Sequence, residues 1–237
     1  MGFRTNYKGL RGYCEMAKGN KAAAEKNLSW AYEHGLTKPA YLTAYGALLM
    51  QQKNYQKCLE VYTRAVQNTP EDSGFMPTIK ASIITCRYKL GQQDDSILED
   101  ARALYEKHKS STIYMLYGYL LMRAGKLEEA LKINLEGYEY DDKDASLCDN
   151  LGQTYYLMGD TENAKKYFTQ AVNIKYNMVD SCYFLAEIYM AEDNIKKAYD
   201  LLDDAKDAPF SALTTVTREQ INEKYELAEK ILKEHII

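Results

Sequence analysis

Small residues recur in this chain at a fixed interval of 34 positions. The set around Gly152 is matched by one set 34 residues earlier and another 34 residues later: Gly118, Ala130 and Gly137; Gly152, Ala164 and Ala171; Ala186, Ala198 and Ala205. Two helical patterns joined by a turn at residues 158–160 fill the central copy. A period of this length is typical of stacked repeats, in which each unit buries its apolar face against its neighbours.

Six units follow when Gly152 is taken as the eighth residue of a 34-residue unit. Their ranges are 5–38, 39–72, 77–110, 111–144, 145–178 and 179–212. Positions 8, 20 and 27 are mostly Gly or Ala, which lets the two antiparallel helices of a unit approach closely. Residues 73–76 interrupt the period, and the flanking Pro70 and Pro77 predict a longer loop there. Within it, Phe75 and Met76 are candidates either for a binding tip or for packing against the adjacent helices.

The unit 145–178 carries Leu151, Gly152, Tyr155, Ala164, Phe168 and Ala171, and the unit 39–72 carries Tyr45, Gly46, Leu49, Tyr62, Ala65 and Pro70. These residues resemble the pattern of the tetratricopeptide repeat, and the resemblance covers about residues 5–212. It implies an all-α fold: a right-handed α-solenoid of six helix–turn–helix repeats that forms a single array over residues 1–237. Ile84 stands where the pattern has Gly, and Asp100 and Asn134 stand where it has an aromatic residue. We therefore expect altered packing near the middle of the array.

The two ends of the chain differ from the inner units. Arg11 and Glu15 are polar where other units are apolar and are spaced to pair on one helix face, which is typical of a solvated terminal repeat. This favours a natural N-terminal end near the start of the chain. Thr217 and Gln220 form a capping-box pattern that predicts a closing helix over about residues 217–234. One face of that helix, with Ile221, Tyr225, Ala228 and Leu232, would cover the last repeat.

Residues that could support catalysis do not gather in this sequence. His34, His108 and His235 are far apart, and no phosphate-binding loop, nucleophile elbow or zinc-protease motif occurs. We therefore expect a protein that is not an enzyme, with no catalytic residue, no cofactor and no metal.

Charge and cysteine content limit the partners and the compartment. The net charge of −4 argues against nucleic-acid binding. Residues 1–110 hold 16 basic and 11 acidic residues, and residues 111–237 hold 14 basic and 23 acidic residues. The two halves of the chain therefore have opposite net charge, and the first half of one copy could attract the second half of another. Five cysteines without metal-site spacing suggest buried free thiols in a reducing compartment. No apolar run is long enough for direct membrane insertion. We expect a cytoplasmic protein or a soluble fragment of a membrane-anchored parent.

The resemblance also implies that the first helices of the repeats line a concave groove, chiefly at positions 2, 5, 9, 12 and 13 of each unit. Position 12 forms a methionine–tyrosine stripe, a surface that can accept varied apolar partners. Asp149, Asp180 and Glu187 would make one end of the groove acidic and suited to a positive segment. The candidate partner-binding residues are Tyr13, Met16, Met50, Tyr88, Lys89, Met115, Tyr119, Met122, Arg123, Asp149, Gln153, Tyr156, Tyr183, Glu187 and Met190.

A groove of this kind indicates a binding function. The sequence favours a non-catalytic scaffold or adaptor that binds a protein or peptide of unknown identity. The alternatives are a self-associating structural module, in which a homo-oligomer forms through the oppositely charged halves, and a regulatory repeat region of a larger protein.

Overall fold

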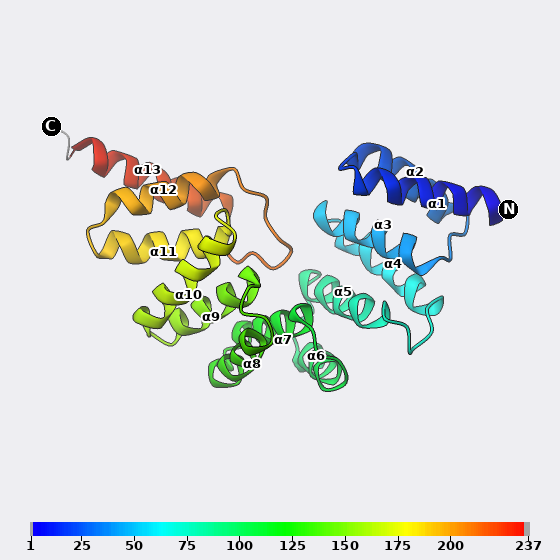
Figure 1. The fold of residues 1–237 in the computed structure, drawn as a ribbon, viewed down its shortest axis with the longest axis horizontal. Helices are drawn as coiled ribbons and strands as arrows, with labels where there is room; N and C mark the ends of the chain where they lie inside the picture. The colour runs from blue at the N-terminus through cyan, green and yellow to red at the C-terminus, as the bar shows by residue number, and fades with distance from the viewer. Residues whose placement is uncertain (1, 235–237) are drawn as a thin grey trace. The chain divides into compact units, whose positions relative to one another are not determined.

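The computed structural model describes residues 2–234, and within that range the chain forms helices joined by turns and loops, with no strand (Figure 1). The helices are α1 (Gly2–Ala17), α2 (Lys21–Glu33), α3 (Pro39–Gln51), α4 (Tyr55–Gln67), α5 (Met76–Lys89), α6 (Asp95–Lys107), α7 (Ser111–Arg123), α8 (Leu127–Tyr140), α9 (Ala145–Leu157), α10 (Thr161–Ile174), α11 (Val179–Ala191), α12 (Ile195–Lys206) and α13 (Arg218–Glu234).

Each odd-numbered helix from α1 to α11 packs against the helix that follows it, and α13 packs on α12. The all-α fold of six helix–turn–helix pairs and a closing helix, predicted from the sequence, is confirmed. The helices form two compact units, residues 1–108 with α1–α6 and residues 109–237 with α7–α13. The six repeat ranges and their union in a single array remain a prediction.

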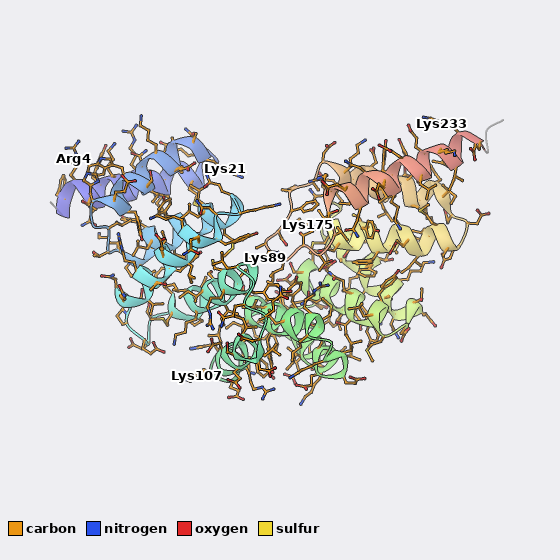
Figure 2. All side chains as sticks on the ribbon, turned by 180° about the vertical axis from the view of Figure 1, so that it is seen from behind. Arg4, Lys21, Lys89, Lys107, Lys175 and Lys233 are labelled. Atoms are coloured by element: carbon orange, nitrogen blue, oxygen red, sulfur yellow. The ribbon has the colours of Figure 1, made fainter. Side chains whose placement is uncertain are left out.

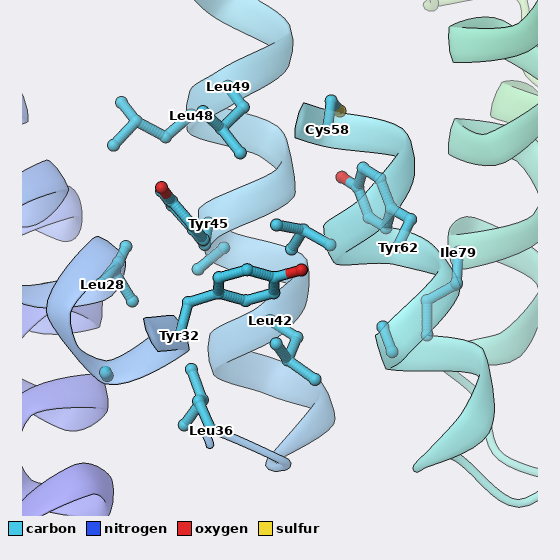
Figure 3. Close-up of a cluster of buried hydrophobic side chains, with 14 of the residues drawn as sticks. Leu28, Tyr32, Leu36, Leu42, Tyr45, Leu48, Leu49, Cys58, Tyr62 and Ile79 are labelled. Atoms are coloured by element: carbon cyan, nitrogen blue, oxygen red, sulfur yellow. The ribbon is translucent and has the colours of Figure 1, made fainter. Parts of the chain in front are cut away.

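Glycine at position 8 of a unit faces the second helix at very short range. A Cβ atom added to Gly46 would lie 2.5 Å from the ring of Tyr62, and one added to Gly152 would lie 2.4 Å from the ring of Phe168. Real Cβ atoms do not come so close to a ring, so a larger residue would push the two helices apart. The glycines therefore let large second-helix side chains fill the space between paired helices. The buried core of unit 1 contains Tyr62 with Leu42, Leu48 and their neighbours (Figure 3).

The two middle pairs, α5–α6 and α7–α8, have a different contact at this place, as expected from their sequence. Asn134 is completely buried. Its Nδ2 donates to Thr154 Oγ1 at 3.0 Å, and its Oδ1 accepts from Asn150 Nδ2 at 3.3 Å, so the buried amide is satisfied. In the α5–α6 pair, Ile84 takes the place of glycine, and Asp100 stays exposed and pairs with Arg87. A cavity of about 340 Å³ opens beside these residues.

A left-handed backbone residue marks the turn inside every helix pair. These residues are Gly19, Lys53, Gly91, Gly125, Gly159 and Asp193, with φ between 59° and 97°. They recur with the same 34-residue period, apart from the four extra residues at 73–76. The left-handed region is open to glycine and costly for most side chains, which explains glycine at four of the six turns. Lysine and aspartate take this position in two of the turns, so glycine alone does not show the period in the sequence.

The longer loop predicted before the third unit is present, and residues 68–75 join α4 to α5. Met76 is the first residue of α5 and is buried, so it packs rather than forming a tip. Phe75 precedes the helix and is 48% exposed. Pro77 lies in the first turn of α5, where its missing N–H has no helical partner to lose.

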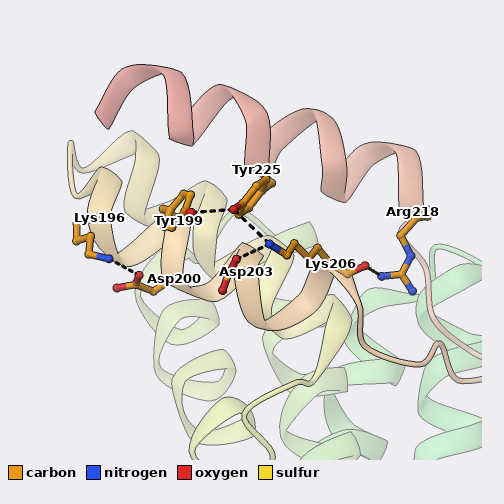
Figure 4. A network of polar contacts seen from close by, with 7 residues as sticks. All are labelled: Lys196, Tyr199, Asp200, Asp203, Lys206, Arg218 and Tyr225. Atoms are coloured by element: carbon orange, nitrogen blue, oxygen red, sulfur yellow. Dashed lines mark hydrogen bonds and ion pairs between the residues drawn. The ribbon is translucent and has the colours of Figure 1, made fainter. Parts of the chain in front are cut away.

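The closing helix begins as the sequence predicted. Thr217 N donates to Gln220 Oε1 at 2.8 Å, and Gln220 N donates to Thr217 Oγ1 at 3.2 Å, which is a capping box. Ile221 and Ala228 are buried against the preceding pair. Polar contacts join α13 to α12: Tyr225 and Tyr199 share a hydrogen bond of 2.7 Å, and Arg218 donates to the Lys206 carbonyl (Figure 4).

Two expectations for single residues are wrong. Glu15 does not pair with Arg11; instead it lies 3.8 Å from Lys18 Nζ and accepts from Asn20 Nδ2 at 3.1 Å. The cysteines are free, and four are buried, but Cys14 is exposed on α1 because it faces away from the neighbouring helices.

Candidate functional site

Unit 1 has an apolar hollow between its first two odd-numbered helices, α1 and α3. Its volume is about 460 Å³. Alanines form much of the wall, and a side chain that ends at Cβ leaves space where a longer one would fill it. The residues that line it are Tyr13, Met16, Ala17, Ala40, Thr43, Ala44, Ala47 and Phe75.

The rim and one wall of this hollow have groups that a ligand could use. Tyr13 and Phe75 are each 48% exposed, and the ring of Tyr13 lies 6.0 Å from that of Tyr41. Thr43 Oγ1 is buried and has no hydrogen-bond partner within residues 2–234. A buried hydroxyl without a partner is uncommon and costs free energy, so a polar ligand atom that reached it would be stabilised. Met16, one of the predicted residues, lines the hollow, and both Met16 and Met50 pack against the core of unit 1. Tyr88 and Lys89 are half-buried on α5 and do not line the hollow.

In unit 2, a segment of the chain itself covers the matching face of α9 and α11. This segment, residues 207–217, joins α12 to α13 and is called the strap below (Figure 1). Thr215 N, Thr215 Oγ1 and Val216 N donate to Asp180 Oδ1 at 2.9, 2.8 and 3.1 Å. Thr215 Oγ1 also lies 3.4 Å from Gln153 Oε1. Val216 is buried, so the strap is packed and not only hydrogen-bonded.

Two buried carboxyl groups lie under the strap. Asp149 accepts from Gln153 Nε2 at 2.7 Å and from Ser181 Oγ. Burial, and then the charge of Asp180, raises the pKa of Asp149 to about 7. Burial also raises the pKa of Asp180, although hydrogen bonds from Val216 and Thr215 oppose that rise. The pair is thus a polar support for the strap.

The prediction of an acidic groove end that is free to bind a partner is therefore wrong. Glu187 accepts from Tyr156 Oη at 3.0 Å and forms an ion pair with Lys224 of α13. Lys224 Nζ also lies 4.8 Å from the ring centroid of Tyr183. The side chains of all three acidic residues, Asp149, Asp180 and Glu187, thus already have partners within the chain. A positive partner segment would have to displace these groups before it reached them.

A smaller cavity remains next to the strap, with a volume of about 300 Å³. Its lining combines first-helix residues with the strap and α13: Arg123, Gln153, Tyr156, Leu157, Tyr183, Phe184, Glu187, Thr215, Val216 and Gln220. Five of these, namely Arg123, Gln153, Tyr156, Tyr183 and Glu187, are predicted partner-binding residues that the fold brings together.

The predicted residues of unit 2 differ in exposure. Tyr119, Met122, Asp149, Gln153 and Tyr183 are buried, with exposed fractions of 2–8%. They can support the residues that form a surface, but they expose little area for a partner to contact. Met115 and Met190 are half-buried, and Arg123 is exposed. The periodicity could not separate these classes, because it assigns a residue to a helix face without showing what covers that face.

Several residues that line the two cavities were not predicted from the sequence. Ala40, Thr43 and Ala44 line the hollow of unit 1 from α3. They are not among the candidate partner-binding residues. Thr215 and Val216 lie after the last repeat, where no period remains to place them. No sequence signal in the chain points to the contact of the strap with Asp180.

No group of three or more His, Cys, Asp or Glu side chains in the part of the chain that the structure describes could hold a metal ion. Within residues 2–234, no helix is both long and apolar enough to cross a membrane. His235, the third histidine of the sequence analysis, lies outside the described residues.

Comparison with known proteins supports the repeat assignment. Two family models described as tetratricopeptide repeat match residues 11–73 and 145–178. The human protein O-mannosyl-transferase TMTC1 is 32% identical over 104 residues, which cover 44% of this chain and 12% of that protein. This chain therefore corresponds to only a small part of that relative.

Solved structures share the fold. A thermophilic tetratricopeptide repeat protein from Thermus thermophilus superposes with a TM-score of 0.65 and 21% identity, over 81% of this chain and 99% of that one. A chain of the APC/C hetero-tetramer Cut9–Hcn1 gives a TM-score of 0.73 and 12% identity, over 95% of this chain and 42% of that one. Repeats of this class generally mediate contacts between proteins. The repeat pattern, the paired helices and the two family-model matches agree that this chain is a tetratricopeptide repeat protein.

Proposed function

We propose that this protein is a non-catalytic scaffold or adaptor that binds a protein or peptide, and that the hollow of unit 1 is its main binding surface. The observation that supports this most is the apolar hollow with Tyr13 and Phe75 at its rim. Binding energy at protein interfaces concentrates where a large side chain fills an apolar pocket. Exposed aromatic rings at the rim would add contact area at little cost in side-chain entropy.

The surface of unit 2 has a second role in this proposal. Its predicted residues Arg123, Tyr156 and Glu187 line the cavity beside the strap, and the strap already occupies the adjoining face. A partner would reach Asp149, Gln153 and Tyr183 only if the strap moved. In this proposal the binding surface of the resting protein is the hollow of unit 1, with Met16 in its lining.

The test is affinity capture from a lysate of the source cell with three forms of the full chain. The first is wild type, and the second is a Tyr13→Ala/Phe75→Ala variant. The third is a matched control, Tyr140→Ala/Tyr176→Ala, which removes two exposed rings from unit 2. Circular dichroism checks that all three are folded.

We expect quantitative mass spectrometry to find a protein that wild type and control retain equally and that the rim variant loses at least about tenfold, since a hot-spot residue contributes about 2 kcal/mol or more. Equal capture by all three forms would show that the hollow is not the site. Capture of the chain alone, at a concentration-dependent mass, would place self-association first.

A regulatory role within a larger protein is the second candidate. It is favoured by the relation to TMTC1, of which this chain covers 12%. In that case the hollow would bind another segment of the same polypeptide or a regulatory subunit. The transferase activity in the name of that relative is not assigned to this chain.

A reducing compartment such as the cytoplasm fits this proposal. All five cysteines are free, and Cys14 is exposed on α1. An exposed thiol persists most readily where the surroundings keep thiols reduced.

A further inference from the structure

Helix α1 exposes a continuous apolar stripe on the side away from its packing partners. Phe3, Tyr7 and Leu10 are 88%, 53% and 46% exposed, and Cys14 is exposed as well. Their spacing of four, three and four residues places all four on one face of the helix. This stripe, Phe3–Tyr7–Leu10–Cys14, is called the α1 seam below.

The opposite side of α1 makes the contacts inside unit 1. Thr5, Gly9 and Gly12 are its buried residues. A Cβ added to Gly9 would lie 2.6 Å from the ring of Tyr41 on α3, and one added to Gly12 would lie 2.6 Å from Leu28 on α2. Neighbouring helices of unit 1 therefore already cover the glycine face, and the residues of the α1 seam take no part in these contacts.

Apolar surface of this kind is unusual elsewhere in the described residues. Other exposed large apolar side chains lie mostly at helix ends or in connections, for example Tyr140 at the end of α8 and Tyr176 after α10. A row of apolar side chains along one face of a helix is typical of a surface that is buried against a partner helix.

The charges beside the α1 seam indicate what the partner must carry. Arg4, Arg11 and Lys18 follow one edge of the seam at intervals of seven residues. Arg4 lies 5.1 Å from the ring centroid of Trp30, and Lys18 lies 3.8 Å from Glu15. No ion pair involves Arg11 within residues 2–234. Figure 2 shows Arg4 on the N-terminal part of α1.

We infer that the α1 seam docks an amphipathic helix of another protein, with an apolar stripe flanked by Asp or Glu. The apolar stripes would bury each other, and the acidic flank would pair with Arg4 and Arg11. A second copy of α1 is a poor occupant, because two such helices laid antiparallel would set their arginine rows side by side and repel. This surface is separate from the hollow, so either can exist without the other.

The test uses two synthetic helical peptides with the same leucine stripe, one flanked by Glu and the other by Lys. Fluorescence anisotropy at low salt measures the binding of each to the full chain. We expect the Glu peptide to bind wild type at least about tenfold more tightly than the Lys peptide, and added salt to reduce this ratio. The charge-reversed variant Arg4→Glu/Arg11→Glu should reverse the preference.

Two further variants place the binding on the seam. Phe3→Ala/Leu10→Ala should weaken the Glu peptide at least about tenfold, since two exposed apolar contacts are lost. Leu227→Ala, which removes an exposed leucine from α13, should leave its affinity unchanged. Tyr13→Ala/Phe75→Ala should also leave it unchanged, which separates this inference from the proposed function of the hollow.

The inference is overturned if neither peptide binds, or if both bind wild type equally. It is also overturned if the wild-type chain dimerises and Phe3→Ala/Leu10→Ala abolishes the dimer, because a second copy would then be the occupant. Analytical ultracentrifugation of both forms decides that point.

Discussion

Single glycines set how closely the paired helices approach. Gly152 leaves room for the buried ring of Phe168, and Gly118 leaves room for the buried amide of Asn134. In both pairs the second-helix side chain fills the space that a Cβ would take. In these two pairs, the close approach of the helices therefore depends on the glycine having only a hydrogen atom in place of a side chain.

Gly152→Ala should destabilise the protein by about 1–3 kcal/mol, because its Cβ would lie 2.4 Å from the fully buried ring of Phe168. Gly2→Ala is the matched control, since no atom lies within 4 Å of its added Cβ. The control should change the free energy of unfolding by about 0.5 kcal/mol or less. Urea unfolding followed by circular dichroism measures both. Equal stabilities of the two variants would contradict the close approach.

Asp149 should make stability depend on pH. Its pKa in the folded state is about 7, above the ordinary value of 3.8, so the folded state favours the protonated form. Its stabilising contribution is complete below about pH 4 and is lost as the pH rises through about 7. Each unit of difference between folded and unfolded pKa corresponds to about 1.4 kcal/mol.

The measurement compares wild type with Asp149→Asn between about pH 4 and about pH 8. We expect the free energy of unfolding of wild type to fall relative to that of the variant as the pH rises. Asp142→Asn changes an exposed aspartate of the same unit and should follow wild type. A constant difference between wild type and Asp149→Asn would show that Asp149 does not titrate in this range.

At the scale of the elements, one side chain of α11 accepts several of the hydrogen bonds from the strap. Asp180 accepts from Thr215 N, Thr215 Oγ1 and Val216 N. Asp180→Ala leaves two backbone amides without a partner, which costs about 1–3 kcal/mol for each buried group. We expect amide hydrogen exchange at Thr215 and Val216 to accelerate at least about tenfold. Asp207→Ala, an exposed residue of the same segment, should leave it unchanged, and unchanged exchange in Asp180→Ala would mean that packing alone holds the strap.

The elements differ in how far the sequence predicted them. The six helix pairs and the capping box at Thr217 were predictable because small residues and cap residues act locally, and the structure has both. The strap was not predictable, since Asp180 and Thr215 are 35 residues apart and no period links them. Likewise, spacing placed Tyr119 and Met122 on a first helix but could not show that they are buried. Burial depends on which segments cover a face, and that is a tertiary property.

For the whole molecule, the two compact units predict independent folding. Residues 1–108 and 109–237 each enclose complete helix pairs. Stability in repeat proteins is a sum of units and their nearest neighbours, so a fragment that keeps whole pairs keeps most of its stabilising contacts. We expect the fragment 109–237 to be helical and to unfold cooperatively by circular dichroism. A fragment that begins at residue 127, and so lacks α7, should unfold at a lower temperature, whereas equal melting of both would contradict the importance of complete pairs.

The strap also affects which ligands unit 2 can respond to. Because both of its ends are tethered to helices, its effective local concentration is on the order of millimolar or higher. A free peptide that made only the same contacts with Asp180 and Gln153 would compete poorly at ordinary cellular concentrations. Under the proposed binding function, the strap would act as a threshold: unit 2 would bind only a peptide whose contacts stabilise the complex more than those of the strap. A chain with its own competitor built in can be selective without being a tight binder of any single sequence.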